Sequence, residues 1–242
     1  MGVMTELLFR DDAYLKSCDA TVLAINERGG IVLDRTVCYA TAGGQPGDGG
    51  VLNFAGNSLA IATAVYDADK NVVHVPAPET ELPAPGLSVN LALDWDTRYR
   101  NMRGHTLMHL LCATVPFPVT GGAVTEDGGR IDFDIPEGET PDKAELARKI
   151  NALIRENHPV SFRWITDAEM ETNLHLVRTM SVKPPMGSGH VRLVAIGENG
   201  SVDLQPCGGT HVRSTAEIGP IAVGKIENKG KQNRRIRLVF ES

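Results

Sequence analysis

The stretch His105-Thr106-Leu107-Met108-His109 decides how the chain is organised. It lies within residues 99–113, where apolar and polar residues recur at helical spacing, and Pro116 ends the pattern. Because residues four apart share one face of a helix, this spacing predicts that both imidazoles point the same way. The stretch therefore offers half of a chelating site on one helix.

A second stretch, Cys207-Gly208-Gly209-Thr210-His211, offers the other half. Its paired glycines allow a turn tight enough to bring a thiolate and an imidazole together. Nitrogen and sulfur donors in a set of four suit tetrahedral zinc, whereas calcium and magnesium favour oxygen. We predict one zinc ion per chain, and its predicted ligands are His105, His109, Cys207 and His211. The alternative keeps the helical histidines as hydrogen-bonded residues and Cys207 as a small apolar side chain in a turn.

The composition is that of a folded protein with room for one large domain or two modest ones. The chain has 242 residues, of which 42% are apolar and 22% are charged. No basic region with an apolar run opens it, and no stretch approaches the ~20 apolar residues of a membrane span. We expect a cytoplasmic protein without a membrane partner. The four cysteines show no paired spacing, so a disulfide framework is not expected.

Charge is distributed unevenly along the chain. The net charge is −6, but residues 1–97 carry 5 Lys and Arg against 13 Asp and Glu, and the remaining residues carry 19 against 17. Basic residues cluster near the C-terminus, and a local cluster can hold phosphates because charges act within about 8 Å at physiological salt. The alternative is a solvated strand edge with charges that block edge pairing. The candidate phosphate-binding residues are Lys229, Lys231, Arg234 and Arg235.

The first part of the chain reads as short strands separated by turns. Apolar or alternating runs occur at residues 21–25, 30–34, 59–65, 72–75 and 87–93. Strands without long helices between them predict a small barrel or sandwich. Helical periodicity begins at residues 96–98, so we expect domains at residues 1–97 and 98–242.

The second part mixes helices and strands. Thr140-Pro141-Asp142 opens a helix with a capping hydroxyl and Pro in the first turn, and Ala147, Ile150 and Ile154 form its buried stripe. Thr166 with Glu169 forms the capping box of a shorter helix. We expect an α+β domain with helices on one face of an antiparallel sheet. Its predicted strands are residues 130–135, 190–196, 202–205, 218–226 and 235–240.

A glycine-rich loop occupies residues 39–50. Glycines such as Gly43 and Gly44 let a backbone approach a ligand closely, Thr41 and Gln45 can offer hydrogen bonds, and Asp48 offers a carboxylate. The Lys-Ser/Thr pair that completes a nucleotide-binding Walker loop is absent, which excludes that function here. A turn with a bulge is the alternative, and the spacing alone favours it.

Taken together, these segments resemble the editing domain of alanyl-tRNA synthetases and, more closely, the freestanding alanyl-tRNA editing proteins of the AlaX type. The resemblance spans nearly the whole chain. Leu107 and Ala42 depart from the family pattern, which usually has a small residue at the first position and a glycine at the second. The matching text is Asn-Met-Arg-Gly-His-Thr-Leu-Met-His-Leu-Leu at 101–111, Val-Asp-Leu-Gln-Pro-Cys-Gly-Gly-Thr-His-Val at 202–212, Lys-Gly-Lys-Gln-Asn-Arg-Arg-Ile at 229–236 and Gly-Gly-Gln-Pro-Gly-Asp at 43–48.

The resemblance implies an N-terminal β-barrel followed by the α/β editing core shared by threonyl- and alanyl-tRNA synthetases. It implies hydrolysis of the ester that joins serine or glycine to alanine tRNA. Because 242 residues leave no room for an aminoacylation domain, the protein is expected to act in trans on mischarged alanine tRNA. A non-catalytic, zinc-stapled tRNA-binding module and a metal hydrolase for another acyl ester or amide are the rival hypotheses.

The reaction needs a water to attack the aminoacyl carbonyl, and zinc can lower the pKa of bound water from about 15.7 to about 7 or polarise the carbonyl. Four protein ligands, however, fill a tetrahedron. One ligand is therefore loose, or the coordination expands, or zinc only orients the tRNA end. Thr41 and Gln45 are the candidates for recognising the amino acid or the water, with Gly43, Gly44 and Asp48 beside them. Asp203 either orients a ligand histidine or is an exposed strand residue.

Overall fold

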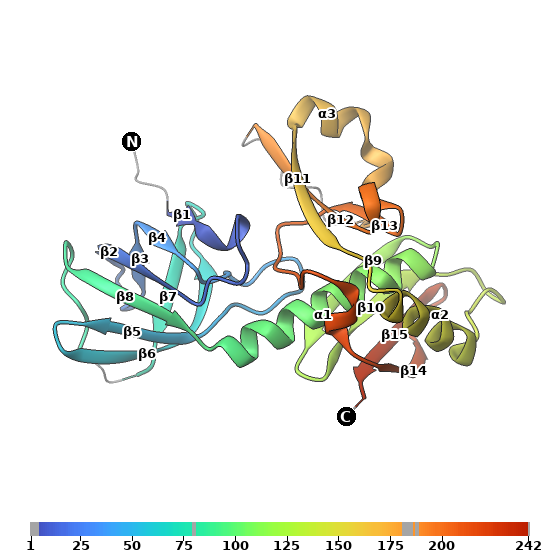
Figure 1. Cartoon of the computed structure of the whole chain (residues 1–242), viewed down its shortest axis with the longest axis horizontal. Helices are drawn as coiled ribbons and strands as arrows, with labels where there is room; N and C mark the ends of the chain where they lie inside the picture. Colours follow the sequence, from blue (N-terminus) through green and yellow to red (C-terminus); the bar gives the residue numbers. More distant parts are fainter. Residues whose placement is uncertain (1–4, 79–80, 181–185, 187–188, 242) are drawn as a thin grey trace. The chain divides into compact units, whose positions relative to one another are not determined.

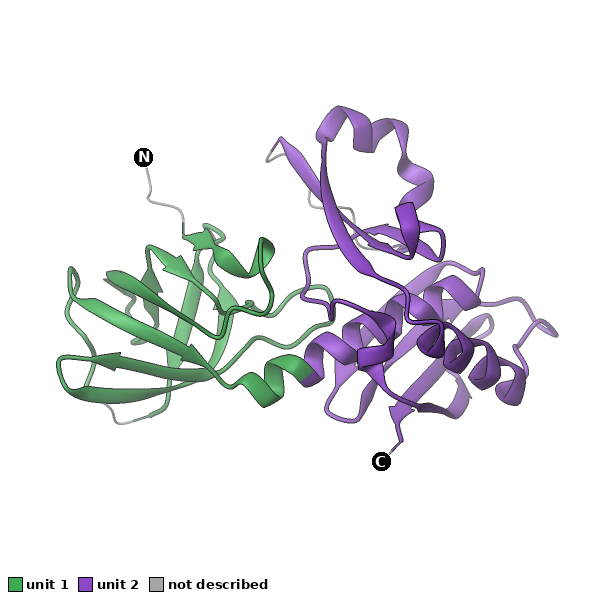
Figure 2. Ribbon diagram, viewed as in Figure 1, with its two compact units in different colours: residues 1–99 green, residues 100–242 purple. Residues whose placement is uncertain are grey.

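The computed structural model describes residues 5–78, 81–180, 186 and 189–241 (Figure 1). The chain divides into two compact units, Met1–Tyr99 and Arg100–Ser242, which Figure 2 colours separately. The division falls inside the long helix α1 (Trp95–Thr114). Among the described helices, none combines the length and the apolar character needed to cross a membrane.

The first unit is a closed barrel of six strands, which confirms the barrel that the sequence and the family resemblance predict. Every hydrogen-bonded pair of neighbours in the barrel is antiparallel. The expected strands are present, but the sequence analysis missed β5 and a small parallel pair, β1 (Glu6–Leu7) with β4 (Arg35–Thr36). Around the barrel the order is β2 (Ser17–Ile25), β3 (Ile31–Leu33), β7 (Val72–Pro76), β6 (Asn57–Tyr66), β5 (Gly50–Phe54) and β8 (Ser88–Leu93).

A buried histidine lies in the barrel unit. His74, on β7, is completely buried, and its Nδ1–H donates to the Ile31 carbonyl at 3.0 Å. Its Nε2 then accepts from the Thr36 hydroxyl at 2.8 Å, and that hydroxyl oxygen accepts from the Cys38 N–H. Both ring nitrogens are thus satisfied by a neutral imidazole. Burial lowers the pKa of His74 from 6.5 to about 4, against an opposing effect of the Ile31 hydrogen bond.

This histidine predicts an acid-sensitive fold. The unfolded chain binds a proton at His74 near pH 6.5, but the folded chain binds it only near pH 4, so stability is complete above pH 6.5 and falls as the pH drops toward 4. We expect His74 alone to remove about 3 kcal/mol of unfolding free energy over that window. Urea titrations at pH 7 and pH 4.2, followed by circular dichroism, measure the loss.

The matched variant is His74→Gln, whose amide offers both a donor and an acceptor and does not titrate. Its stability should fall by about 3 kcal/mol less than that of the wild type between the two pH values. Equal losses in both proteins would contradict a neutral, buried His74.

The glycine-rich loop forms a tight turn at its tip. Ala42 and Gln45 exchange backbone hydrogen bonds, and Gly43 and Gly44 between them have φ of 55° and 82°, a region that disfavours other residues. Farther along, a Cβ on Gly47 would lie 2.0 Å from the Ala64 carbonyl oxygen. The glycines are therefore explained by the turn and by close backbone packing against β6, the interpretation that the spacing alone favours.

A buried ion pair anchors the end of this loop to the first turn of α1. The side chains of Arg98 and Asp48 are 0% and 1% exposed, and Arg98 Nε donates to Asp48 Oδ2 at 2.9 Å. Arg98 also donates to the carbonyls of Ala13 and Val37, and Asp48 Oδ2 accepts from the Tyr39 N–H at 2.6 Å. Asp48, a candidate substrate-binding residue, thus holds the two ends of its own loop together.

The second unit contains two antiparallel sheets instead of the single one expected. The larger has the order β14 (Ile221–Asn228), β15 (Asn233–Phe240), β10 (Gly128–Asp134) and β9 (Val119–Thr125), and the smaller has the order β11 (Val160–Thr166), β12 (His190–Ile196) and β13 (Asp203–Pro206). β9 and β11 are strands that the sequence analysis did not identify. The second unit also has the short helix α3 (Asp167–Thr172) and single 3-10 turns at Leu174–Leu176, Glu198–Gly200 and Thr215–Ile218.

Helices pack on one face of the larger sheet, as the sequence predicts. α1 lies so close to β10 that a Cβ on Gly104 would meet the Gly128 carbonyl at 2.6 Å, and a Cβ on Gly129 would meet the Met108 sulfur at 2.8 Å. α2 (Lys143–Arg155) lies against β14, where the Asn151 amide binds both the carbonyl and the N–H of Ile221.

The helix caps correct one detail of the sequence analysis and confirm another. Asp142, not Thr140, caps α2 by accepting from the Glu145 N–H, because its short carboxylate stands directly before the first helical residue. Leu146, with Ile150 and Ile154, forms the buried stripe, and Ala147 is only half-buried. The capping box of Thr166 and Glu169 is present as predicted.

Candidate metal centre

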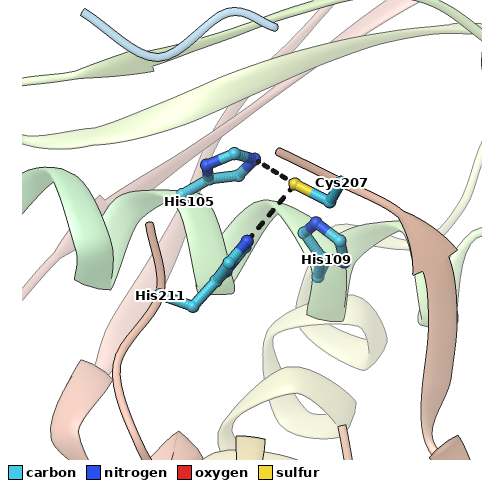
Figure 3. Close-up of side chains that lie close together, drawn as sticks. All are labelled: His105, His109, Cys207 and His211. Atoms are coloured by element: carbon cyan, nitrogen blue, oxygen red, sulfur yellow. Dashed lines mark hydrogen bonds between the residues drawn. The ribbon is translucent and has the colours of Figure 1, made fainter. Parts of the chain in front are cut away.

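Helix α1 and the loop after β13 bring four donor side chains together inside the second unit. Figure 3 shows His105 and His109 on successive turns of α1, with Cys207 and His211 facing them. Their donor atoms all lie within 4.8 Å of one another, although Cys207 is 102 residues from His105 in the sequence. The four side chains that meet are those predicted as ligands from the sequence.

The donor spacing fits a tetrahedral ion. Cys207 Sγ lies 3.5 Å from His105 Nε2 and 3.3 Å from His211 Nε2. Zn–S and Zn–N bonds of about 2.3 and 2.0 Å at tetrahedral angles place sulfur and nitrogen roughly 3.5 Å apart. The Gly209 N–H points at the sulfur from 3.4 Å, which favours a thiolate. Three nitrogens and one sulfur at this spacing can hold one divalent ion.

Asp203, on β13, orients one of the histidines. The His109 Nδ1–H donates to Asp203 Oδ2 at 2.7 Å, which leaves Nε2 as the atom available to a metal. The Gln205 amide in turn donates to both carboxylate oxygens at 2.9 Å. Asp203 is buried, so its carboxylate lies behind the donor cluster and not on an exposed strand.

Thr106 orients a second histidine and was missed by the sequence analysis. Its hydroxyl donates to the Met102 carbonyl, and its oxygen lies 3.1 Å from His211 Nδ1 and 3.3 Å from the Val212 N–H. His211 Nδ1–H can therefore donate to it, and Nε2 faces Cys207. Its position was the available signal of a functional role, because threonine is a poor helix former and this one lies in a helix interior between two candidate ligands.

Arg192, on β12, holds the Cys-Gly-Gly loop and was also missed. Its Nη1 donates to the carbonyls of Cys207 at 3.2 Å and Gly209 at 2.9 Å. The Cys207 N–H donates back to the Arg192 carbonyl at 3.0 Å. Side chain and backbone of one residue thus fix the loop that carries the sulfur donor, and no local sequence pattern indicates such a contact.

The surroundings set the protonation of the cluster. Burial raises the pKa of the Cys207 thiol, but the imidazoles of His105 and His211 lower it, and the net pKa lies well below its usual value. For His109, burial lowers the pKa, while Asp203 and Cys207 raise it to about 10, so a metal that binds Nε2 displaces a proton from it. Burial and the neighbouring His105 lower the pKa of His211 to about 3. A thiolate at Cys207 is the state that metal ligation requires.

The candidate residues of the glycine-rich loop belong to the first unit, and the donor cluster belongs to the second. Thr41 is exposed, and its oxygen accepts from the Gly47 N–H at 2.9 Å. Gln45 is completely buried, whereas Gly43 and Gly44 are exposed at the tip of the turn. The roles of these residues in catalysis and substrate binding remain predictions.

The basic residues near the C-terminus make contacts of their own. Arg235 forms two hydrogen bonds, of 2.7 and 2.8 Å, with Asp132 across the sheet, and Lys229 pairs with Glu227 at 2.7 Å. Arg234 is buried and donates to carbonyls of its own hairpin, and Lys231 is exposed. Contact of these four residues with tRNA stays a prediction.

Each of the two units contains a segment that matches a known protein family. Residues 191–237 match the family model described as the threonyl and alanyl tRNA synthetase second additional domain, and residues 13–97 match that of class II (A) tRNA synthetases. The alanyl-tRNA editing protein AlaX-M of Methanosarcina mazei is 37% identical, over 96% of this chain and 95% of its own length.

Longer relatives contain the same region as a part. The alanyl-tRNA editing protein AlaX-L of Pyrococcus horikoshii is 34% identical over 96% of this chain and 57% of its own length. The alanine–tRNA ligase of Pyrobaculum aerophilum is 35% identical over 92% of this chain and 25% of its own length. With its barrel, its editing-type second unit and near full-length similarity to AlaX-M, the chain belongs to the AlaX family of alanyl-tRNA editing proteins.

Proposed function

We propose that this protein is a zinc-dependent hydrolase that removes serine or glycine from mischarged alanine tRNA in trans. The observation that carries the proposal is the cluster of three imidazoles and one thiolate, two members of which lie in the segment that matches the synthetase additional domain. Membership of the editing family supports an RNA ester as the substrate. His105, His109, Cys207 and His211 would hold the ion.

The reaction breaks the ester bond between the amino-acid carbonyl carbon and a ribose oxygen, and water supplies the oxygen of the new carboxylic acid. Bound zinc supplies polarisation of the carbonyl or acidification of a water. The chain fixes the donors beforehand: Asp203 and Thr106 aim the Nε2 atoms of His109 and His211, and Arg192 fixes the loop of Cys207. Such pre-set donors need no rearrangement during the reaction.

Amino-acid choice is proposed to lie with the glycine-rich loop. Thr41 is exposed, and its hydroxyl accepts from the Gly47 N–H and donates to the Ala64 carbonyl, so the orientation of this hydroxyl is fixed before a substrate binds. A fixed polar group favours a substrate that pairs with it and disfavours alanine, which cannot. Gln45, Gly43 and Gly44 are proposed to complete this recognition.

The closed set of four donors favours one alternative, a metal that only stabilises the fold of an RNA-binding module. Deacylation assays separate the two. Zinc-loaded protein is incubated with alanine tRNA charged with serine, glycine or alanine, and release of the amino acid is measured. We expect turnover of the seryl or glycyl ester and little release of alanine. Absence of turnover on all three would remove the hydrolase proposal.

The orientation of His109 gives a prediction for metal affinity. Asp203→Asn should keep the fold but weaken zinc binding by about 10- to 100-fold, because the amide no longer favours the tautomer with a free Nε2. Competition with a chelating dye measures the affinity. The control is Asp127→Asn, whose carboxylate accepts from the Thr125 hydroxyl and is not part of the donor cluster; the backbone carbonyl of Asp127, which accepts from the Phe240 N–H, is unchanged. Equal zinc affinity in both variants would contradict an orienting role for Asp203.

A further inference from the structure

The smaller sheet of the second unit presents two aromatic side chains to solvent. Phe162 and Trp164, on the edge strand β11, are 39% and 41% exposed. Because successive side chains on a strand point to opposite faces, residues 162 and 164 lie on the same face. Two neighbouring aromatic side chains expose more apolar surface than the single exposed apolar residues that are common on proteins.

The register of the sheet shows that this face also carries the support of the donor cluster. Trp164 lies opposite Arg192 and Phe162 opposite Val194, which lies opposite Gln205 on β13. Opposed residues of antiparallel strands share a face, so the aromatics, Arg192 and Gln205 point the same way. α1 covers the β13 side, where His109 binds Asp203, and the β11 side remains exposed.

A chain of contacts joins the aromatics to the candidate metal centre. The Arg192 guanidinium lies over the Phe162 ring at 4.5 Å, and the same side chain donates to the carbonyls of Cys207 and Gly209. One residue therefore separates the exposed ring from the loop that carries the sulfur donor. A ligand that lies on this face and continues past Arg192 arrives at the donor cluster.

The charge of the sheet favours an anionic ligand. On the face of Phe162 and Trp164, β11 and β12 carry Arg192 and His190 and no carboxylate. The nearest acidic helix, α3, packs through Met170 against Val191 and Leu193, on the opposite face. Exposed aromatic rings beside cationic side chains are the combination that binds unpaired nucleotides, whose bases stack while their phosphates are attracted.

We propose that Phe162 and Trp164 form a stacking surface for the unpaired 3′ nucleotides of the acylated RNA, which leads the ester to the donor cluster. The proposal rests on the proposed function for the identity of the substrate. It assigns these side chains to binding, since stacking is made equally before and during the reaction. Loss of such a contact raises KM and leaves kcat unchanged.

The first test uses the fluorescence of Trp164. The chain has two tryptophans, so Trp95→Phe leaves Trp164 as the single reporter. This variant is titrated with an uncharged minihelix of the alanine tRNA acceptor stem that ends in four unpaired nucleotides, and with the same minihelix lacking them. We expect the tailed RNA to quench Trp164 and the blunt RNA not to. Equal quenching by both RNAs would overturn the proposal.

The second test removes the rings. Trp164→Ala and Phe162→Ala should each weaken binding of the tailed minihelix by roughly 5- to 100-fold. Each should raise the KM for alanine tRNA charged with serine by a similar factor. Leu174→Ala, which changes another exposed apolar residue of the same unit, is the control and should alter neither value. Unchanged affinity in both aromatic variants would overturn the proposal.

Two further outcomes are informative. If the aromatics were the interface of a second copy of this chain, sedimentation would show a dimer that Trp164→Ala dissociates, and the proposal would fail. If the wild type binds the tailed RNA through Trp164 but releases no amino acid, the stacking surface stands and only the proposed hydrolysis is lost.

Discussion

Cys207→Ala is expected to lose its bound zinc and to deacylate mischarged alanine tRNA at least about 1,000-fold more slowly than the wild type, since the ion supplies several kcal/mol to the transition state. Removing the only sulfur donor leaves three imidazoles, and it also removes the negative charge that favours the cation. Elemental analysis gives the metal content, and single-turnover deacylation gives the rate.

Cys112→Ala is the matched control. Cys112 lies on α1, is buried and is 3 residues from His109, but its sulfur is not among the clustered donor atoms, and burial raises the pKa of its thiol to about 12. We expect this variant to keep its zinc and its activity. A Cys112 variant that lost as much as Cys207→Ala would contradict the assignment of the donor.

The same pair of variants separates catalysis from a structural staple. In its described residues the second unit buries apolar side chains of its own between sheets and helices, so we expect Cys207→Ala to remain folded while it is inactive. If zinc only closed the fold, loss of the metal would unfold the unit, because its binding energy would then be folding energy. Circular dichroism of the metal-free variant distinguishes the two cases.

Arg98→Met is expected to destabilise the barrel unit by about 3 to 5 kcal/mol, the cost of leaving a buried carboxylate without its partner. The side chain is completely buried and binds Asp48, Ala13 and Val37, so methionine replaces its volume but none of its hydrogen bonds. Urea unfolding at pH 7, followed by circular dichroism, measures the loss.

Two comparisons make this result specific. The double variant Arg98→Met with Asp48→Asn should recover a large part of the lost stability, because it removes the unpaired charge and keeps an acceptor for the Tyr39 N–H. Arg35→Met breaks an exposed ion pair with Glu6 and should cost less than about 1 kcal/mol. Equal costs for Arg98 and Arg35 would show that the buried pair does not hold the loop.

Local patterns predicted the elements that have strong periodicity or a clear cap. The helix that carries His105, the strand at residues 190–196 and the capping box of Thr166 all follow from short segments whose preferences agree with the fold. β9 was missed because Gly121 and Gly122 interrupt it. β11 alternates apolar and polar residues from Val160 to Trp164, so the sequence does indicate this strand, and it was overlooked.

By itself, the sequence determined the chemistry of the candidate centre: two imidazoles one helical turn apart, and a thiolate and an imidazole across a glycine turn. Only the tertiary structure decided that Asp203 aims His109, that Thr106 aims His211, that Arg192 holds the Cys207 loop, and that Arg98 holds Asp48. The physical reason is range. Helix spacing and turns depend on neighbours in the chain. Most of these contacts join residues 50 to 105 positions apart, and the contact of Arg192 joins a strand to the loop after the next strand. All of them form only when packing brings the residues together.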